Sequence, residues 1–87
     1  MDIHALTTSD VLDRIARHCP QAMTTYLHCL HHCDVDGRHH FTRIEIEEDM
    51  SEDFRTFKNH IKKLSREGLL EWHTIDNGIL MSLIDNQ

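Results

Sequence analysis

The stretch from Asp53 to Leu70 constrains the fold more than any other part of the chain. Four apolar side chains recur in it at helical spacing and therefore share one face of a helix: Phe54, Phe57, Ile61 and Leu64. Gly68 follows where a left-handed residue commonly ends a helix, and two leucines then begin an extended run. We therefore expect an amphipathic helix over about 53–67 with its apolar face in the core.

The remaining faces of this helix are basic, although the chain as a whole is acidic. Between residues 53 and 67, five Lys and Arg residues stand against two acidic ones, whereas the 87-residue chain has a formal net charge of -6. The negative total argues against indiscriminate nucleic-acid binding, but salt screens charges over about 8 Å, so a local patch can act alone. The plainer alternative is an ordinary solvated helix face.

Length and composition indicate one soluble domain over residues 1–87. The chain is 39% hydrophobic and 28% charged, as in an ordinary globular protein. It has no run of 18 apolar residues, so we expect no membrane contact, and its first residues do not form a signal peptide. Three cysteines without a disulfide-like spacing favour a reducing, cytoplasmic location.

Two helices are predicted in the N-terminal part of the chain. The first covers about 8–19, with N-cap candidates at its start and an apolar stripe formed by Val11, Leu12, Ile15, Ala16 and Cys19. The second covers about 20–33, opens at Pro20 and has the stripe Met23, Tyr26, Leu27, Leu30 and Cys33. A turn over 34–38 and a short strand over 39–41 follow.

The segment 43–50 is ambiguous, because Ile44 and Ile46 alternate as in a strand. We favour a short helix capped by Thr42, since the four acidic residues of this segment are poor strand formers. Beyond Gly68, two runs rich in strand formers flank Asp76-Asn77-Gly78, and Asn-Gly is a strong hairpin signal. We therefore expect a two-stranded hairpin over about 69–84.

This order of elements resembles the winged helix-turn-helix family. The residues that carry the resemblance are I-E-E-D-M (46–50) for the first motif helix, S-E-D (51–53) for the turn, F-R-T-F-K-N-H-I-K-K-L-S-R-E-G-L-L (54–70) for the recognition helix and W-H-T-I-D-N-G-I-L-M-S-L (72–83) for the wing. The resemblance implies an α+β winged helix-turn-helix fold with an extra N-terminal helix, a helix-turn-helix over about 43–67 and a short two-stranded wing. Two departures are that Ser51 replaces the usual glycine of the turn, and Asp76 replaces a basic wing residue.

The resemblance further implies a sequence-specific DNA-binding protein, a transcriptional regulator of the bacterial, phage or plasmid type. The second motif helix inserts its N-terminal residues into the major groove, where Arg pairs with guanine and Asn with adenine. The DNA-facing residues are then Arg55, Thr56, Lys58, Asn59 and Lys62. Lys62, together with Lys63 and Arg66, is better placed to contact phosphates.

Two further expectations concern partners. A small DNA-binding protein gains affinity from two half-sites, so we expect a homodimer on double-stranded DNA, with Val11, Ile15 and Cys19 supplying the contact. The acidic run Glu45, Glu47, Glu48, Asp49, Glu52 and Asp53 would repel phosphates if it faced the same side as the basic helix. The alternative function is therefore a protein-interaction module that uses the same fold and an acidic surface.

A cluster of histidines and cysteines raises a third hypothesis, a metal-responsive regulator. The chain has nine histidines, and the pairs His28/His32 and Cys29/Cys33 each have i,i+4 spacing, which zinc ligands can adopt on one helix face. The pattern contains no C-x-x-C, and Cys33 also fits an apolar stripe, so we assign no metal and no cofactor. No nucleophile motif or phosphate loop is present, so we expect no enzyme.

Overall fold

The computed structural model describes residues 8–84, which form an α+β arrangement. The elements follow one another in the order α2 (Ser9–His18), η1 (Pro20–Ala22), α3 (Met23–His32), β1 (Arg38–Thr42), η2 (Glu45–Asp49), α4 (Phe54–Arg66), β2 (Leu70–Ile75) and β3 (Gly78–Leu83). Within the described residues, no helix is both long enough and apolar enough to cross a bilayer. The expected order of elements is confirmed. The helix expected over 20–33 is divided in two, and the strand expected over 39–41 is longer, at Arg38–Thr42.

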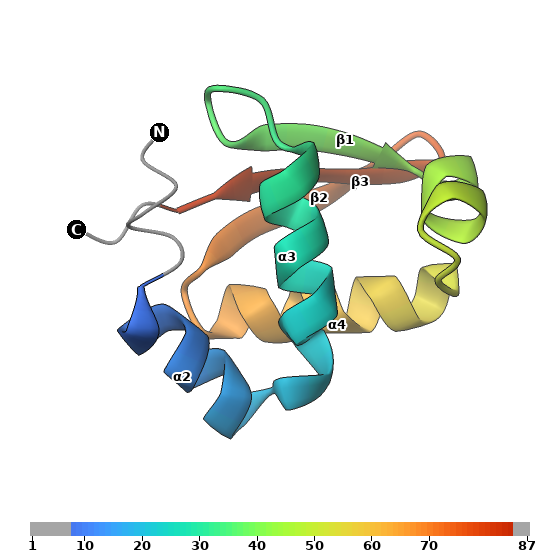
Figure 1. Ribbon diagram of the computed structural model, residues 1–87. Helices are drawn as coiled ribbons and strands as arrows, with labels where there is room; N and C mark the ends of the chain where they lie inside the picture. The colour runs from blue at the N-terminus through green and yellow to red at the C-terminus, as the bar shows by residue number, and fades with distance from the viewer. Residues whose placement is uncertain (1–7, 85–87) are drawn as a thin grey trace.

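The strands form one antiparallel sheet in the order β1-β3-β2, so the last strand of the chain lies in the middle. Ile79 of β3 lies opposite Phe41 of β1 on one side and Thr74 of β2 on the other. In Figure 1, α4 runs beside the sheet, α3 crosses it, α2 lies near the C-terminal end of α4 and η2 lies at the opposite end. Alternate residues of β3 are buried under these helices, as the period of a strand requires.

Helix α4 begins and ends where its local sequence dictates. The N–H of Thr56 donates to Oδ2 of Asp53 at 3.1 Å, so Asp53 is the N-cap of α4. At the other end Gly68 has a φ of 75°, and the N–H of Leu69 donates to the carbonyl of Leu64 at 3.1 Å, which closes a Schellman motif. The chain therefore leaves α4 directly into β2.

We expect Gly68→Ala to lower the free energy of unfolding by about 1 kcal/mol, because a left-handed φ costs an L-residue that much. A Cβ at this position would meet no atom within 4 Å, so the loss comes from the backbone alone. Urea unfolding followed by circular dichroism measures it. Gly68→Asn is the matched variant and should lose less, because asparagine tolerates this conformation. An alanine variant as stable as the parent would contradict the prediction.

The second predicted helix, 20–33, is divided into η1 and α3. Pro20 occupies the first position of η1, as expected, and the chain then continues into α3 from Met23.

Helix α2 is attached to the end of α4 by polar contacts. The guanidinium of Arg14 donates to the backbone carbonyl of Glu67, and Nδ1 of His18 lies 2.8 Å from Oε1 of Glu67.

The core confirms most of the predicted apolar stripes but corrects the one on α3. Phe57, Ile61 and Leu64 of α4 are fully buried, and Phe54 is half-buried against them. On α3, however, Leu27 is 48% exposed and Cys29 is fully buried. Met23, Tyr26, Leu30 and Cys33 of the predicted stripe are in the core or packed against it. The correction is therefore confined to Leu27, and the buried face also includes Ala22 and Cys29.

The residues proposed for a dimer contact belong to this same core. Ile15 and Cys19 are 0% and 3% exposed, and Val11 is half-buried against the same cluster. Because Ile15 and Cys19 are buried within their own chain, they cannot also form the predicted contact between two chains. The assignment of that contact to α2's apolar stripe is therefore wrong.

The ambiguous segment is helical, as we favoured, but its turn is wider than that of an α-helix. Oγ1 of Thr42 accepts a hydrogen bond from the N–H of Glu45, which confirms the predicted cap. The N–H of Met50 then donates to the carbonyl of Glu45, five residues back, at 3.1 Å. Only Ile46 of η2 is buried, so packing constrains this helix at a single side chain.

The hairpin is present, but Gly78 belongs to strand β3 and not to the turn, where the Asn-Gly signal had placed it. The two-residue loop is Asp76-Asn77, with a φ of 47° at Asp76, and Gly78 is already the first residue of β3. A Cβ on Gly78 would overlap the carbonyl oxygen of Phe41 in β1. Glycine is therefore required here by the close approach of the neighbouring strand and not by the turn.

Candidate nucleic-acid interface

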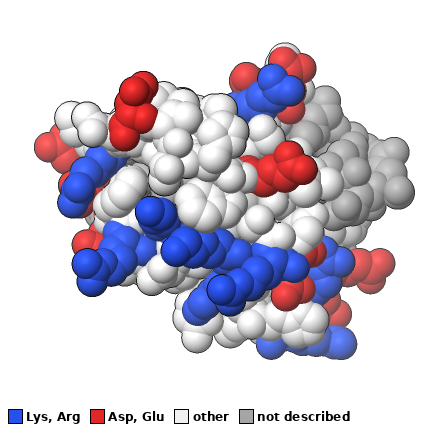
Figure 2. All heavy atoms as spheres, turned by 180° about the vertical axis from the view of Figure 1, so that it is seen from behind, with Lys and Arg blue, Asp and Glu red and all other residues white. Residues whose placement is uncertain are grey.

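The exposed side of α4 carries the residues that the sequence singled out. Six of the seven are exposed and one, Lys58, is half-buried. The exposed six are Arg55, Thr56, Asn59, Lys62, Lys63 and Arg66. Figure 2 shows Lys and Arg side chains as a band across the lower half of one face of the molecule, with few acidic side chains inside it. The buried stripe of Phe57, Ile61 and Leu64 fixes this orientation, because it attaches the opposite side of the helix to the core.

A shallow hollow of about 650 Å³ lies at the N-terminal half of α4. Its lining includes four of the predicted residues and three others; the full set is Arg43, Asp53, Phe54, Arg55, Lys58, Asn59 and Lys62. Thr56, Lys63 and Arg66 lie outside it, so the predicted set divides into a concave part and a flanking part. Four cations line this hollow with one carboxylate, which gives it a positive local charge.

Arg43 is a member of this surface that sequence reasoning missed. It lies between β1 and η2, and its guanidinium carbon is 5.2 Å from the centre of the Phe54 ring, a cation–π geometry. Nε of Arg43 is also 3.4 Å from Oε1 of Glu47, and the Arg43 side chain remains 61% exposed. Phe54 thus supports an arginine at the rim of the hollow, a contact between elements that no local pattern in the sequence could indicate.

The acidic run before α4 is mostly engaged with other parts of the protein. Oε1 of Glu45 is 2.8 Å from His39, and Glu52 contacts Thr25 and His60. Glu47 pairs with Arg43, and Asp53 caps α4. Of the six residues, only Asp53 lines the hollow. The acidic run therefore weakens the positive field of this surface and enters the hollow only through Asp53.

A buried polar cluster holds α4 in place beneath its basic face. Oγ1 of Thr25 on α3 lies 2.9 Å from Nδ1 of His60 on α4, and the same nitrogen is 3.1 Å from Oε1 of Glu52. Oγ1 of Thr25 also donates to that carboxylate at 3.2 Å. Because Thr25 is fully buried, this cluster ties the turn before α4 to both helices. Sequence reasoning did not find it, since Thr25 is 27 residues from Glu52 and 35 from His60 in the chain.

The turn at Ser51 and the β2–β3 hairpin carry less positive charge than α4. Ser51 adopts a positive φ of 50°, a conformation for which glycine is usual. The exposed loop Asp76-Asn77 and both strands of the hairpin contain neither Lys nor Arg. The hairpin therefore adds no cation to those of α4 and Arg43.

The predicted histidine and cysteine candidates are not brought together. Cys29 is fully buried, and Sγ of Cys33 donates to the carbonyl of Leu30 at 3.3 Å. Burial raises the pKa of both thiols, which disfavours the thiolate that metal ions bind. Of the set His28, Cys29, His32 and Cys33, only His32 joins a cluster of possible metal ligands among residues 8–84.

Comparison of the chain with models of protein families, with curated protein sequences and with solved structures found no match. The assignment of function therefore rests on the side chains and their geometry.

Proposed function

We propose that this protein is a winged helix-turn-helix protein that binds double-stranded DNA sequence-specifically and regulates transcription. The order of elements supports this fold: a short helix (η2), a tight turn and a longer helix (α4) precede a hairpin, and the sheet order is β1-β3-β2. In this interpretation η2 and α4 are the two motif helices, and β2 and β3 form the wing.

The observation that carries the proposal is the concave basic surface at the start of α4. Arg55 and Asn59 are exposed there, and these side chain types form paired hydrogen bonds with guanine and adenine. Lys58, Lys62 and Arg43 line the same hollow and are suited to phosphates. The first half of α4 therefore presents side chains that can read bases together with cations that can contact phosphates, as a helix inserted into the major groove requires.

The flanking part of α4 completes the contact. Lys63 and Arg66 are exposed in the last turns of the helix, where the phosphate backbone passes a recognition helix. The wing has no cation, so it adds little affinity. A homodimer remains a prediction, and its contact would have to use residues other than the buried stripe of α2.

Selection of bound sequences from a random duplex pool tests the proposal. We expect one enriched site, and binding to it should weaken steeply with salt because each phosphate contact releases counterions. With phosphate contacts from the five residues Arg43, Lys58, Lys62, Lys63 and Arg66, log K against log salt concentration should have a slope of about -4.5. A pool without enrichment, together with no salt-dependent binding to any duplex, would overturn the proposal and favour the protein-interaction module.

A further inference from the structure

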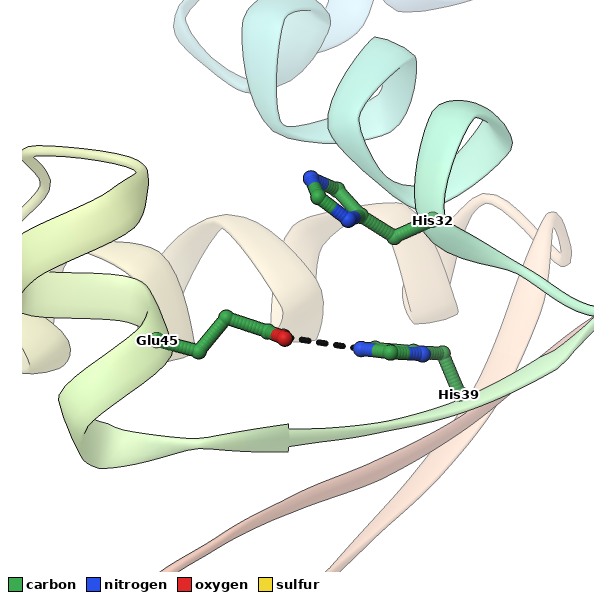
Figure 3. Close-up of side chains that lie close together, drawn as sticks. All are labelled: His32, His39 and Glu45. Carbon is green, nitrogen blue, oxygen red and sulfur yellow. Dashed lines mark hydrogen bonds and ion pairs between the residues drawn. The ribbon is translucent and has the colours of Figure 1, made fainter.

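Three side chains from three different elements meet beside α3. They are His32 at the end of α3, His39 in β1 and Glu45 at the start of η2, and one ligand atom from each lies within 4.8 Å of those from the others. Figure 3 shows the His32 ring above the hydrogen bond that joins His39 and Glu45, with all three side chains directed into the space between these elements. Each of the three is only partly exposed.

The fold holds this cluster in position before any ligand binds. His39 and Phe41 lie on the face of β1 that is covered by helices, with ring centroids 4.4 Å apart, and the His32 ring lies 5.7 Å from that of His39. Nε2 of His39 is 2.8 Å from Oε1 of Glu45, and Thr42 caps the N–H of Glu45. Backbone and ring contacts therefore fix two ligands, and His32 lies close enough to be the third.

The three donors have the chemistry of a transition-metal site. Imidazole nitrogens and one carboxylate oxygen are typical ligands of zinc, whereas calcium and magnesium prefer oxygen alone. Tetrahedral zinc with bond lengths of about 2.0–2.1 Å places its ligand atoms about 3.3 Å apart. The His39–Glu45 pair needs to open by a few tenths of an ångström to reach that spacing, and a change of the His32 side-chain rotamer can supply the rest.

We propose that His32, His39 and Glu45 form a binding site for one divalent transition-metal ion of the zinc type, with a fourth position open to water. The ion would join the end of α3 to β1 and η2. Because Glu45 lies two residues after Arg43, the site would also fix the segment that presents Arg43 at the hollow. The metal site does not depend on the proposed DNA-binding function.

Titration of tag-free, chelator-treated protein with Zn²⁺ or Co²⁺ in competition with a chromophoric chelator tests this proposal. We expect one ion per chain and, with Co²⁺, the visible absorption of a tetrahedral complex. Saturating Zn²⁺ should raise the melting temperature by at least about 5 °C, because an ion that binds only the folded chain stabilises it. His32→Ala and Glu45→Gln should each weaken binding by at least about 10- to 100-fold.

Matched variants separate this site from adventitious binding by the other histidines. His31→Ala removes the neighbouring exposed histidine and Glu48→Gln an exposed acid of η2, and neither should change the affinity. Broadening of imidazole resonances by Co²⁺ in the unaltered chain gives a readout that needs no variant and should select His32 and His39. If the control variants lose as much affinity as the site variants, or if Co²⁺ broadens other histidines instead, the proposal is wrong.

Discussion

Reversal of two charges in the hollow, Lys58→Glu with Lys62→Glu, should weaken binding to the selected duplex by at least about 100-fold at physiological salt. Both lysines line the concave surface, and each reversal replaces an attraction to phosphate by a repulsion. The slope of log K against log salt concentration should become less steep by about one unit for each lost phosphate contact. Fluorescence anisotropy with labelled duplex, measured at several salt concentrations, gives both quantities.

The matched control is the double variant Arg17→Glu with Arg38→Glu, which changes the net charge by the same amount. Arg17 lies on α2 and Arg38 at the start of β1, and both are exposed outside the hollow. This control should retain most of the affinity. If both double variants bind equally, or if the Lys58/Lys62 variant binds like the parent chain, then α4 does not contact DNA through this face.

Gly78→Ala should lower the free energy of unfolding by about 3 kcal/mol or more, a large part of the stability of a domain of this size. The new Cβ would overlap the Phe41 carbonyl oxygen and lie 3.0 Å from Nε2 of His40. Because the first obstacle is backbone in a neighbouring strand, a side chain rotation cannot relieve it. Urea unfolding should show a lower midpoint, and a larger loss would show as a chain that fails to fold.

Ser82→Ala, on the same strand, is the control for loss of strand stability in general and should change the midpoint little. Comparison with Gly68→Ala isolates the effect of the steric overlap, since a Cβ at position 68 would meet no atom within 4 Å. The expected order of loss is therefore Gly78→Ala well above Gly68→Ala. Equal losses, or a Gly78→Ala variant with the midpoint of the parent, would show that β1 and β3 can move apart at little cost.

The sequence predicted those parts of the fold that local chemistry determines. The limits of α4 follow from Asp53 as an N-cap and Gly68 as a left-handed end, and both have these roles in the structure. The hairpin was also predicted correctly, although the reason given for Gly78 was wrong, because the nearby carbonyl of Phe41 belongs to a strand far away in sequence. A turn signal cannot reveal a contact of that kind.

Features that depend on packing between distant elements were missed. The buried face of α3 passes through Cys29 and leaves Leu27 exposed, and hydrophobicity alone ranked these two in the opposite order. Arg43 reaches the hollow because Phe54 supports it. His32 was noticed only for its spacing from His28, yet its neighbours in space are β1 and η2. In each case the relevant partner lies on another element.

The central place of β3 has a consequence for how the chain acquires its structure. β1 and β2 do not pair with each other, and each depends on β3 for its hydrogen bonds. Because β3 is the last of the three strands in the chain, a growing polypeptide exposes two unpaired strands until synthesis has passed residue 83. Pairing of β1 with β3 then closes a long loop, a slow step compared with formation of the adjacent hairpin. During synthesis, β1 is therefore the strand that waits longest for its partner and is the most exposed to wrong pairing with other chains.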